Sequence, residues 1–336
     1  MADSATVTES RALTPEKVTA INMFWQNVNE KSFTSDDNIT LAYVTNFKRE
    51  NKPYVVIVSG RSEGYLKYQE LAYDLDVAGY DSVIIDHRGQ GLSQRLTKNR
   101  LKGYVKSFDD YAQDLAQLLN RELPRLYPEK QHKQFLLAHS MGGAIALRYL
   151  QRYQNNVQAV VLSSPMIAIS SGGIPNWLAE SIVLSGSKLN SWLSNSPWYF
   201  LGQTDDNSST FADNKLMHSK ERYQRFQALY QQHSELKLGG VTFNWLAQAL
   251  KANQDIFQQI EKISPPILML QASEEDIVDN AAQNSFCQQL NIVKQDSCID
   301  GKPQVIHGAY HELFFELDEY RNIALESTLN WFEKHQ

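Results

Sequence analysis

The sequence has few of the residues and patterns that mark several common classes of protein. It contains only two cysteines, Cys287 and Cys298, which are too few for the disulfide framework of a small secreted domain. They could pair with each other, but two reduced thiols are the expectation. The sequence has no cluster of histidine and cysteine with metal-ligand spacing, no glycine-rich phosphate loop and no internal repeat. We therefore expect neither a metal nor a nucleotide cofactor.

Long apolar runs and basic runs are also missing. No window approaches the ~18 consecutive apolar residues that a membrane-spanning helix needs. Residues 1–17 are polar, so a secretory signal is not expected. The net charge of −6 argues against nucleic acid as a main partner. These absences predict a cytoplasmic protein.

The patterns that are present predict an α/β protein. An alternating segment at residues 33–44 is typical of an antiparallel hairpin at a sheet edge. Helical patterns at 68–77 and 108–123, the latter ended by Pro124, separate short apolar runs. Runs that are apolar on both faces indicate a mostly parallel, doubly wound sheet covered by helices on both sides. The predicted strands are 54–58, 82–85, 135–137, 159–162, 267–270 and 305–306.

The alternation of strands and helices stops in the second half of the chain. Residues 167–262 show only helical periodicities, and they contain Trp177, Trp192, Trp198 and Trp245. We predict a helical lid, or cap, at 167–262, inserted in a core of residues 23–166 and 263–336, with a loose tail over 1–22. Packing against the core is one interpretation of these aromatic residues. In the other, the rim of the lid rests on lipid, because tryptophan favours the membrane–water interface.

One strand-turn-helix pattern carries a serine at its turn. Residues 134–139 form an apolar strand, Ser140 follows, and residues 141–147 open a helix. This is the Gly-x-Ser-x-Gly pattern of a nucleophile elbow, with Ala138 in the first glycine position and Gly142 in the second. The sharp turn points the serine hydroxyl out of the sheet, so both of these neighbours must be small. The pattern predicts Ser140 as a nucleophile.

Two loops supply the other groups that a serine nucleophile needs. A serine hydroxyl is a poor nucleophile until a neighbouring imidazole can take its proton. His311 lies on the loop after the last predicted strand, whereas its rival His307 lies against that strand and is expected to be structural. The loop at 58–63 follows an early strand, where backbone N–H groups form part of an oxyanion hole. The predicted oxyanion donors are the backbone amides of Arg61 and Met141.

The loop after the penultimate strand must supply the acid that orients the histidine. Either aspartate or glutamate can hold the imidazole tautomer and stabilise the imidazolium. Four carboxylates compete there: Glu274, Glu275, Asp276 and Asp279. Most of them are expected to be solvated. The chain order of serine, acid and histidine, with an oxyanion loop upstream, is that of the α/β-hydrolases.

The chain also resembles a known family. The motifs that carry the resemblance to the monoacylglycerol-lipase-like hydrolases are at residues 86–93, 138–143 and 308–311. The stretches that resemble bacterial lysophospholipases of the membrane-associated kind are 23–26, 37–40, 70–74 and 217–219. The similarity runs from about residue 23 to the C-terminus. It implies an α/β-hydrolase fold, ester hydrolysis of lipids with a single acyl chain, and no cofactor.

The resemblance also narrows the choice of the acid. The family pattern places Glu275 in the position of the acid. Asp279, four residues later, is the alternative, and its carboxylate could instead cap the next helix. Two residues depart from the wider pattern. Ser59 stands where histidine often precedes the oxyanion glycine, and Glu275 stands where aspartate is usual.

These observations predict a serine lysophospholipase, which hydrolyses the acyl ester of a lysophospholipid to a free fatty acid and a glycerophospho-alcohol through an acyl-enzyme. A monoacylglycerol lipase or a general carboxylesterase is the alternative with the same chemistry. A lipid-binding module on an inactive hydrolase fold is the alternative from another class. The expected partners are a single-acyl lipid and, through the lid, a membrane surface, with no nucleic acid. The expected location is the cytoplasm, peripheral on the inner membrane.

Overall fold

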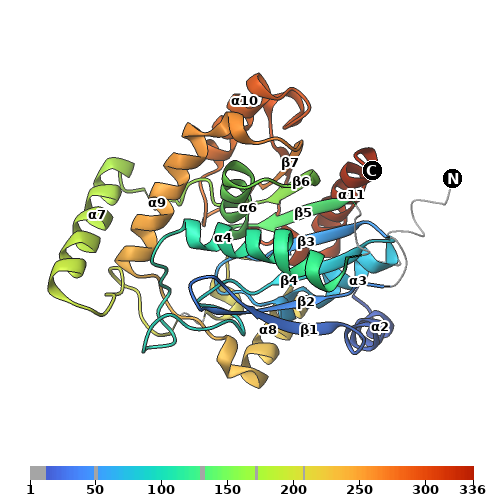
Figure 1. The fold of residues 1–336 in the computed structure, drawn as a ribbon, viewed down its shortest axis with the longest axis horizontal. Coiled ribbons are helices and arrows are strands. Elements are labelled where there is room, and N and C mark those ends of the chain that lie inside the picture. The colour runs from blue at the N-terminus through green and yellow to red at the C-terminus, as the bar shows by residue number, and fades with distance from the viewer. Residues whose placement is uncertain (1–12, 49–51, 129–132, 171–172, 207–208) are drawn as a thin grey trace.

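A single eight-stranded sheet forms the centre of the molecule, in the order β1-β2-β4-β3-β5-β6-β7-β8 (Figure 1). The computed structural model describes all residues except 1–12, 49–51, 129–132, 171–172 and 207–208. Strand β2 pairs antiparallel with β1 and β4. The other pairs of neighbouring strands, which involve β3 to β8, are parallel. The strands are β1 Asn29–Thr34, β2 Thr40–Thr45, β3 Tyr54–Val58, β4 Asp81–Ile85, β5 Gln134–His139, β6 Val157–Ser163, β7 Ile267–Ala272 and β8 Gln304–Ile306.

Helices cover both faces of the sheet, which explains why the central strands are apolar throughout. In β3, Val56 and Val58 pack on one side and Val55 and Ile57 on the other. This alternation follows from the two-residue period of a strand. The first side is covered by α4 (Asp109–Gln117), α6 (Met141–Arg152) and α10 (Asn280–Val293). The second is covered by α3 (Gln69–Val77) and α11 (Asp318–Lys334).

The predicted sheet is confirmed in type and in strand position. Each of the six predicted parallel strands lies within an observed strand, and the predicted hairpin forms β1 and β2. The predicted end of the helix at Pro124 is wrong. After α4 the chain continues through a π-helical turn, η2 (Leu118–Glu122), into α5 (Leu123–Leu126). Pro124 lies in the first turn of α5, where the missing N–H of proline is tolerated.

The predicted tail over residues 1–22 is wrong for its described part. Helix α2 spans Pro15–Trp25, and the Thr14 side chain caps it by accepting the Lys17 amide. Ile21 is fully buried, and the Lys17 ammonium lies 2.9 Å from Asp74 of α3. Only Lys17 and Ile21 of this helix are buried, so it lacks the broad buried face that a periodic pattern would reveal. Residues 1–12 lie outside the described residues.

A long insertion separates β6 from β7. This inserted segment, residues 164–266, contains α7 (Asn176–Leu193), α8 (Lys220–Gln232) and α9 (Phe243–Gln258), with the 3-10 turns η3 (Phe211–Asp213), η4 (Ser234–Leu236) and η5 (Ile260–Lys262). Helix α9 contacts both α6 and α7, so α7 lies at the outer side of the molecule (Figure 1). Among its described residues, the inserted segment forms isolated β-bridges and no strand of the sheet.

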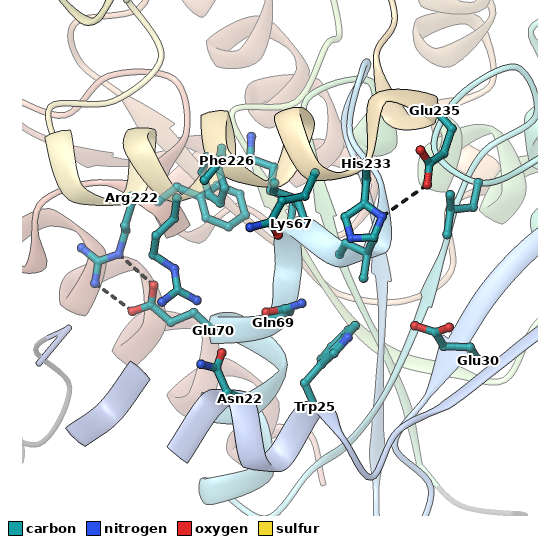
Figure 2. A pocket seen from close by; sticks show the side chains of 17 residues that line it. Asn22, Trp25, Glu30, Lys67, Gln69, Glu70, Arg222, Phe226, His233 and Glu235 are labelled. Atoms are coloured by element: carbon teal, nitrogen blue, oxygen red, sulfur yellow. Dashed lines mark hydrogen bonds and ion pairs between the residues drawn. The ribbon is translucent and has the colours of Figure 1, made fainter. Parts of the chain in front are cut away.

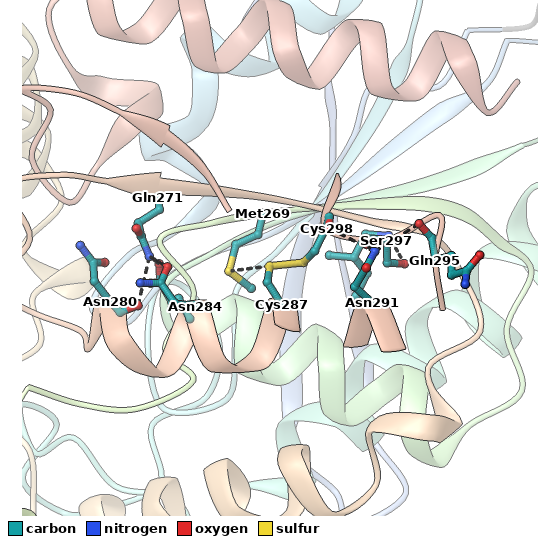
Figure 3. Close-up of a disulfide and its surroundings, with 11 residues drawn as sticks. Met269, Gln271, Asn280, Asn284, Cys287, Asn291, Gln295, Ser297 and Cys298 are labelled. Carbon is teal, nitrogen blue, oxygen red and sulfur yellow. Dashed lines mark hydrogen bonds between the residues drawn. A yellow bond between two sulfur atoms is a disulfide. The ribbon is translucent and has the colours of Figure 1, made fainter. Parts of the chain in front are cut away.

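The expectation of two reduced thiols is wrong in this structure. Cys287 of α10 and Cys298, which precedes the turn η6 (Ile299–Gly301), form a disulfide (Figure 3). Their Cα atoms are 5.3 Å apart because the chain turns back after α10, and the Cys298 amide donates to the Ile267 carbonyl at the start of β7. Both cysteines are buried. The spacing of 11 residues in the sequence does not by itself predict that the fold brings the two cysteines together.

Candidate active site

Ser140 lies on a strained turn between β5 and α6. Its backbone has φ 53° and ψ −119°, a conformation that costs free energy in a residue with a Cβ atom. Hydrogen bonds from the Ser140 amide to the Ser163 carbonyl (3.0 Å) and from the Met166 amide to the Ser140 carbonyl (2.9 Å) hold the turn. A Cβ atom at Gly142 would lie 2.0 Å from the Val58 carbonyl oxygen. The small residue expected at position 142 is therefore required by close backbone approach.

His311 reaches Ser140 from the loop after β8. Its Nε2 lies 2.9 Å from the Ser140 Oγ, and the residue is 3% exposed. The loop turns at Gly308, whose φ of 83° favours glycine. His307 is exposed in the turn that follows β8. The structure thus brings His311 to the serine.

Glu275 lies on the opposite side of the imidazole. Its Oε2 is 2.7 Å from His311 Nδ1, and its Oε1 accepts the backbone amides of Ile277 (2.7 Å) and Val278 (3.2 Å). The carboxylate side chain is completely buried. Burial raises the pKa of Glu275, but the hydrogen bonds from His311 and the two amides outweigh burial and hold the pKa below its usual range. An ionised carboxylate is the form that orients a histidine.

The other three acids of this loop have different environments. Asp279 accepts the amides of Ala281 and Ala282 and caps the N-terminus of α10. Asp276 forms an exposed ion pair with Lys215 at 2.6 Å. Glu274 is exposed. Among the four candidate carboxylates, the structure therefore brings only that of Glu275 to the histidine.

The two predicted oxyanion donors belong to segments that pack against each other. Met141 is the first residue of α6, where backbone N–H groups have no acceptor within the helix. Arg61 follows β3 on a loop whose backbone contacts the elbow, since a Cβ at Gly60 would lie 3.0 Å from the His139 ring. His87 supports this loop because its Nε2 donates to the Ser59 carbonyl at 3.2 Å. Both amides therefore lie on backbone that flanks the serine.

A buried charged cluster behind the site was not anticipated from the sequence. The Lys67 ammonium lies 2.7 Å from both Glu63 and Glu312, and all three residues are buried. Glu63 also accepts the Gly60 amide and the Tyr68 hydroxyl, each at 2.5 Å. The cluster thus connects the oxyanion loop to the residue that follows His311. The only signal in the sequence was the spacing of four residues between Glu63 and Lys67.

The charges of this cluster are strongly coupled. Burial raises the pKa of Glu63, but Lys67 and neighbouring donors outweigh burial and hold the pKa at about 2. Burial raises the pKa of Glu312 above its usual range in spite of Lys67. Burial lowers the pKa of Lys67, but the two glutamates outweigh burial and hold this pKa above its usual range. The ammonium is the counterion that makes two buried carboxylates tolerable.

His139 is close to the site but forms different contacts. Its ring centroid lies 4.9 Å from that of His311, and its Nδ1 donates to the Ser163 carbonyl at 3.2 Å. Burial lowers the pKa of His139 to about 4, so the ring is neutral near pH 7. Ligand atoms of His139, Glu63 and Glu312 lie within 4.8 Å of one another, as at a metal site. Lys67 already supplies a cation to both carboxylates, so these residues fit a metal poorly.

A pocket of about 650 Å³ lies outside this site, between α8 on one side and α2 and α3 on the other (Figure 2). It is lined by Trp25, Lys67, Glu70, Arg222 and other residues, and its lining includes neither Ser140 nor His311. Arg222 and Glu70 are paired with each other at 2.8 Å. His233 and Glu235 form a second pair in this lining, with 3.2 Å between Nδ1 and Oε1.

The fold and the site together define a class of protein. A mostly parallel sheet with a serine on a strained strand-to-helix turn, followed along the chain by an acid and a histidine, is an α/β-hydrolase. The model of the family described as "Serine aminopeptidase, S33" matches residues 49–318. The chain belongs to this family of α/β-hydrolases.

Two similar sequences extend over nearly the whole chain. Lysophospholipase L2 of Escherichia coli (strain K12) is 37% identical over 316 residues, which are 93% of this chain and 89% of the relative. Probable lysophospholipase L2 of Haemophilus influenzae is 32% identical and covers 91% of this chain and 92% of the relative. The monoglyceride lipase of Rattus norvegicus is 28% identical, with coverage of 83% and 82%.

Solved structures share the fold. A soluble variant of monoglyceride lipase from Saccharomyces cerevisiae, in complex with a substrate analog, superposes with a TM-score of 0.69 at 19% identity. The alignment covers 92% of this chain and 95% of that chain. A carboxyl esterase from Bacillus coagulans gives a TM-score of 0.67 at 17% identity, with coverage of 92% and 98%. These likenesses show the α/β-hydrolase fold, which the sequence predicts correctly.

Proposed function

We propose that this protein is a serine lysophospholipase, in which Ser140, His311 and Glu275 are the nucleophile, the general base and its acid. The observation that carries the proposal is the continuous chain of contacts from Ser140 Oγ to His311 (2.9 Å) and on to Glu275 (2.7 Å). The similarity to two lysophospholipases L2 over more than nine-tenths of the chain supports the choice of substrate.

The mechanism follows from this arrangement. Ser140 Oγ attacks the ester carbonyl carbon while His311 Nε2 takes the hydroxyl proton, and Glu275 stabilises the imidazolium. The amides of Arg61 and Met141 donate hydrogen bonds to the oxyanion of the tetrahedral intermediate. His311 then gives its proton to the leaving glycerol oxygen, which leaves an acyl ester on Ser140. Water, deprotonated by His311, attacks this ester and releases the fatty acid.

Monoacylglycerol hydrolysis is the second candidate, because the rat monoglyceride lipase is also similar in sequence. The two functions differ in the head group and share the acyl transfer. The test is the kcat/KM for lysophosphatidylethanolamine, lysophosphatidylcholine and monoacylglycerol that carry the same acyl chain. The proposal predicts the higher values for the lysophospholipids. A preference for monoacylglycerol would assign the second function, and no labelling by a fluorophosphonate would indicate a lipid-binding protein without activity.

The inserted segment completes the proposal as a cap over the active site. Ser140 is 9% exposed, and we propose that part of this segment moves to admit a lipid. Helix α7 presents Trp177 and Trp192 to solvent, 70% and 81% exposed, whereas Trp245 is buried. Exposed tryptophans on an outer helix are typical of a surface that contacts the membrane interface.

We therefore also propose a peripheral association with membranes through α7. Among the residues that the structure describes, no helix is long and apolar enough to cross a membrane. Flotation with phospholipid vesicles at low and high salt tests the association. Because the contact is apolar, high salt should release only part of the bound protein. Absence of binding at low salt would show that α7 serves another purpose.

A further inference from the structure

The side chain of Arg61 has an unusual environment for a partly buried arginine. Its Nη2 donates to the Gly239 carbonyl of the inserted segment, and its Cζ lies 5.7 Å from the centre of the Trp245 ring. Its Nε is buried and has no hydrogen-bond partner. The guanidinium packs so closely over Gly103 that a Cβ atom there would lie 2.8 Å from Nη2. Of the five N–H donors of this arginine, the structure gives an acceptor to one, on Nη2, and leaves the buried Nε without one.

The other buried arginines of the molecule have more partners. Those with carboxylate partners are Arg88, Arg148, Arg222 and Arg321. Arg95 donates to four backbone carbonyls instead, those of Gly89, Gly91, Glu235 and Lys237. Within the described part of the chain, Arg61 forms no ion pair and one hydrogen bond. Among the described residues, no carboxylate forms an ion pair with its guanidinium.

The guanidinium stays charged in this place. Burial lowers the pKa of Arg61 to about 10, which still leaves the side chain protonated at neutral pH. Removing a charged group from water is unfavourable unless an opposite charge or hydrogen bonds compensate. Trp245 offers a partial compensation through its ring face. An anionic ligand would complete it.

The position of Arg61 specifies which ligand this is. Its backbone amide belongs to the proposed oxyanion hole, so the side chain begins beside the ester that Ser140 attacks. The arginine side chain and the arm from ester carbonyl to phosphorus in a 1-acyl glycerophospholipid are each on the order of six bonds, or roughly 7 Å, long. A phosphate therefore lies within reach of the guanidinium when the ester is at Ser140. Guanidinium binds phosphate through two parallel hydrogen bonds.

We propose that the Arg61 side chain binds the phosphodiester of the lysophospholipid head group and sets the preference for phospholipid over monoacylglycerol. This inference rests on the proposed lysophospholipase function. The Gly239 contact is the one hydrogen bond that the phosphate must displace or share, whereas a phosphate offers the guanidinium two parallel hydrogen bonds and an opposite charge. A monoacylglycerol has a hydroxyl at the same place and leaves the guanidinium without its anion.

The test compares non-hydrolysable inhibitors with and without the phosphate. A 1-alkyl ether lysophosphatidylcholine and the matching 1-alkyl glycerol measure head-group binding, because neither contains an ester. Arg61→Met should raise the Ki of the phosphate-bearing ether by roughly 10- to 100-fold more than that of the alkyl glycerol. Arg61→Lys keeps the positive charge but cannot form two parallel hydrogen bonds to a phosphate. It should therefore raise the Ki of the phosphate-bearing ether by only roughly 3- to 10-fold more than that of the alkyl glycerol. Arg125→Met, at an exposed pair with Glu122, is the control for loss of one positive charge and should change neither Ki.

The outcomes separate this inference from the function on which it rests. Equal losses for both ethers in Arg61→Met would overturn the inference and leave the lysophospholipase function intact. A wild-type enzyme that hydrolyses monoacylglycerol and no lysophospholipid would overturn the proposed function, whatever the inhibitors show. If Arg61→Met does not fold, as judged by circular dichroism, Arg61→Lys decides alone, and an unchanged ratio of its two Ki values would overturn the inference.

Discussion

Ser140 combines backbone strain with a nearly complete exclusion of water. The strand β5 and the helix α6 impose its positive φ, and their packing compensates the cost of roughly 1–3 kcal/mol that such a conformation carries. The Ser140 hydroxyl lies within hydrogen-bonding distance of the His311 imidazole. Backbone strain that the surrounding structure holds in place is common at functional positions.

The first prediction concerns this hydroxyl. Ser140→Ala should lower kcat by about 10⁴–10⁶, because the nucleophile acts only together with its base. Binding of an ether lysophospholipid should change little, since the backbone amides remain. The measurement is single-turnover hydrolysis with a purified variant, and more than a tenth of wild-type activity would rule out the acyl-enzyme on Ser140.

The second prediction separates the two acids. Glu275→Gln replaces the carboxylate that contacts His311 Nδ1 by an amide and should lower kcat by about 10³–10⁴. Asp279→Asn is the matched control, because asparagine still caps α10 and the change should cost about 1 kcal/mol or less of stability. Kinetics and urea unfolding of both variants are the measurements. The reverse pattern would transfer the role to Asp279.

At the scale of elements, Lys67 connects two loops that come from opposite ends of the sequence. The third prediction is that Lys67→Met destabilises the protein by about 3–5 kcal/mol, because two buried carboxylates lose their cation. Lys48→Met removes a lysine from a half-exposed pair with Asp76 and should cost at most about 1 kcal/mol. Urea unfolding of both variants measures the difference, and equal effects would contradict the role of the cluster.

The same cluster should affect catalysis through position. Glu63 holds the Gly60 amide, which precedes Arg61, so a looser cluster should lower kcat more than it raises KM. A variant that is destabilised but keeps its full kcat at low temperature would make Lys67 purely structural.

The fourth prediction concerns the disulfide between α10 and the turn before β8. Closing a loop of 11 residues stabilises a protein by about 3 kcal/mol in the chain-entropy description. A reducing agent should therefore lower the free energy of unfolding of the wild type by about this amount. The double variant Cys287→Ala with Cys298→Ala should not respond to the agent. A wild type that unfolds identically with and without reductant would mean that the bond does not form in solution.

Elements with a strong local pattern could be predicted from the sequence. Contacts between residues that only the tertiary fold brings together could not. The strand β3 is a continuous apolar run and was predicted at its observed bounds, Tyr54–Val58. The contact between His311 and Glu275 was expected from chain order and family pattern, and the structure places the two side chains together. The Cys287–Cys298 bond and the Lys67–Glu312 pair join residues whose proximity no local pattern encodes.

Helix α2 shows a second limit of sequence patterns. Only Lys17 and Ile21 of its residues are buried, and a cap at Thr14 and a buried ion pair between Lys17 and Asp74 contribute to its stability. The lysine ammonium is buried against the Asp74 carboxylate rather than exposed to water. Burial of charged pairs is decided by tertiary packing, so periodicity of apolar residues cannot reveal it.

At the scale of the whole molecule, apolar exposure is concentrated at one outer helix. The exposed large apolar residues of α7 are Trp177, Leu178, Leu184, Leu189, Trp192 and Leu193. On a helix they cluster on one side, while Gly186 faces Phe243 of α9, where a Cβ atom would lie 2.3 Å from the ring. Helix α7 therefore has a packed side, which includes Val183, Gly186 and Asn190, and an exposed apolar face, which is the arrangement of an interfacial helix.

The last prediction tests that face directly. Replacing Trp177 and Trp192 together by serine should lower binding to phospholipid vesicles by roughly tenfold or more, because two large apolar side chains no longer leave water. Ile292→Ser on α10 is the control, since Ile292 is also 81% exposed but lies on another element. Turnover of a short-chain soluble ester should stay at the wild-type level in all variants, because the serine, the histidine and their loops are untouched. Vesicle flotation measures the binding, and an equal loss in the Ile292 variant would show that general surface apolarity, rather than α7, determines association.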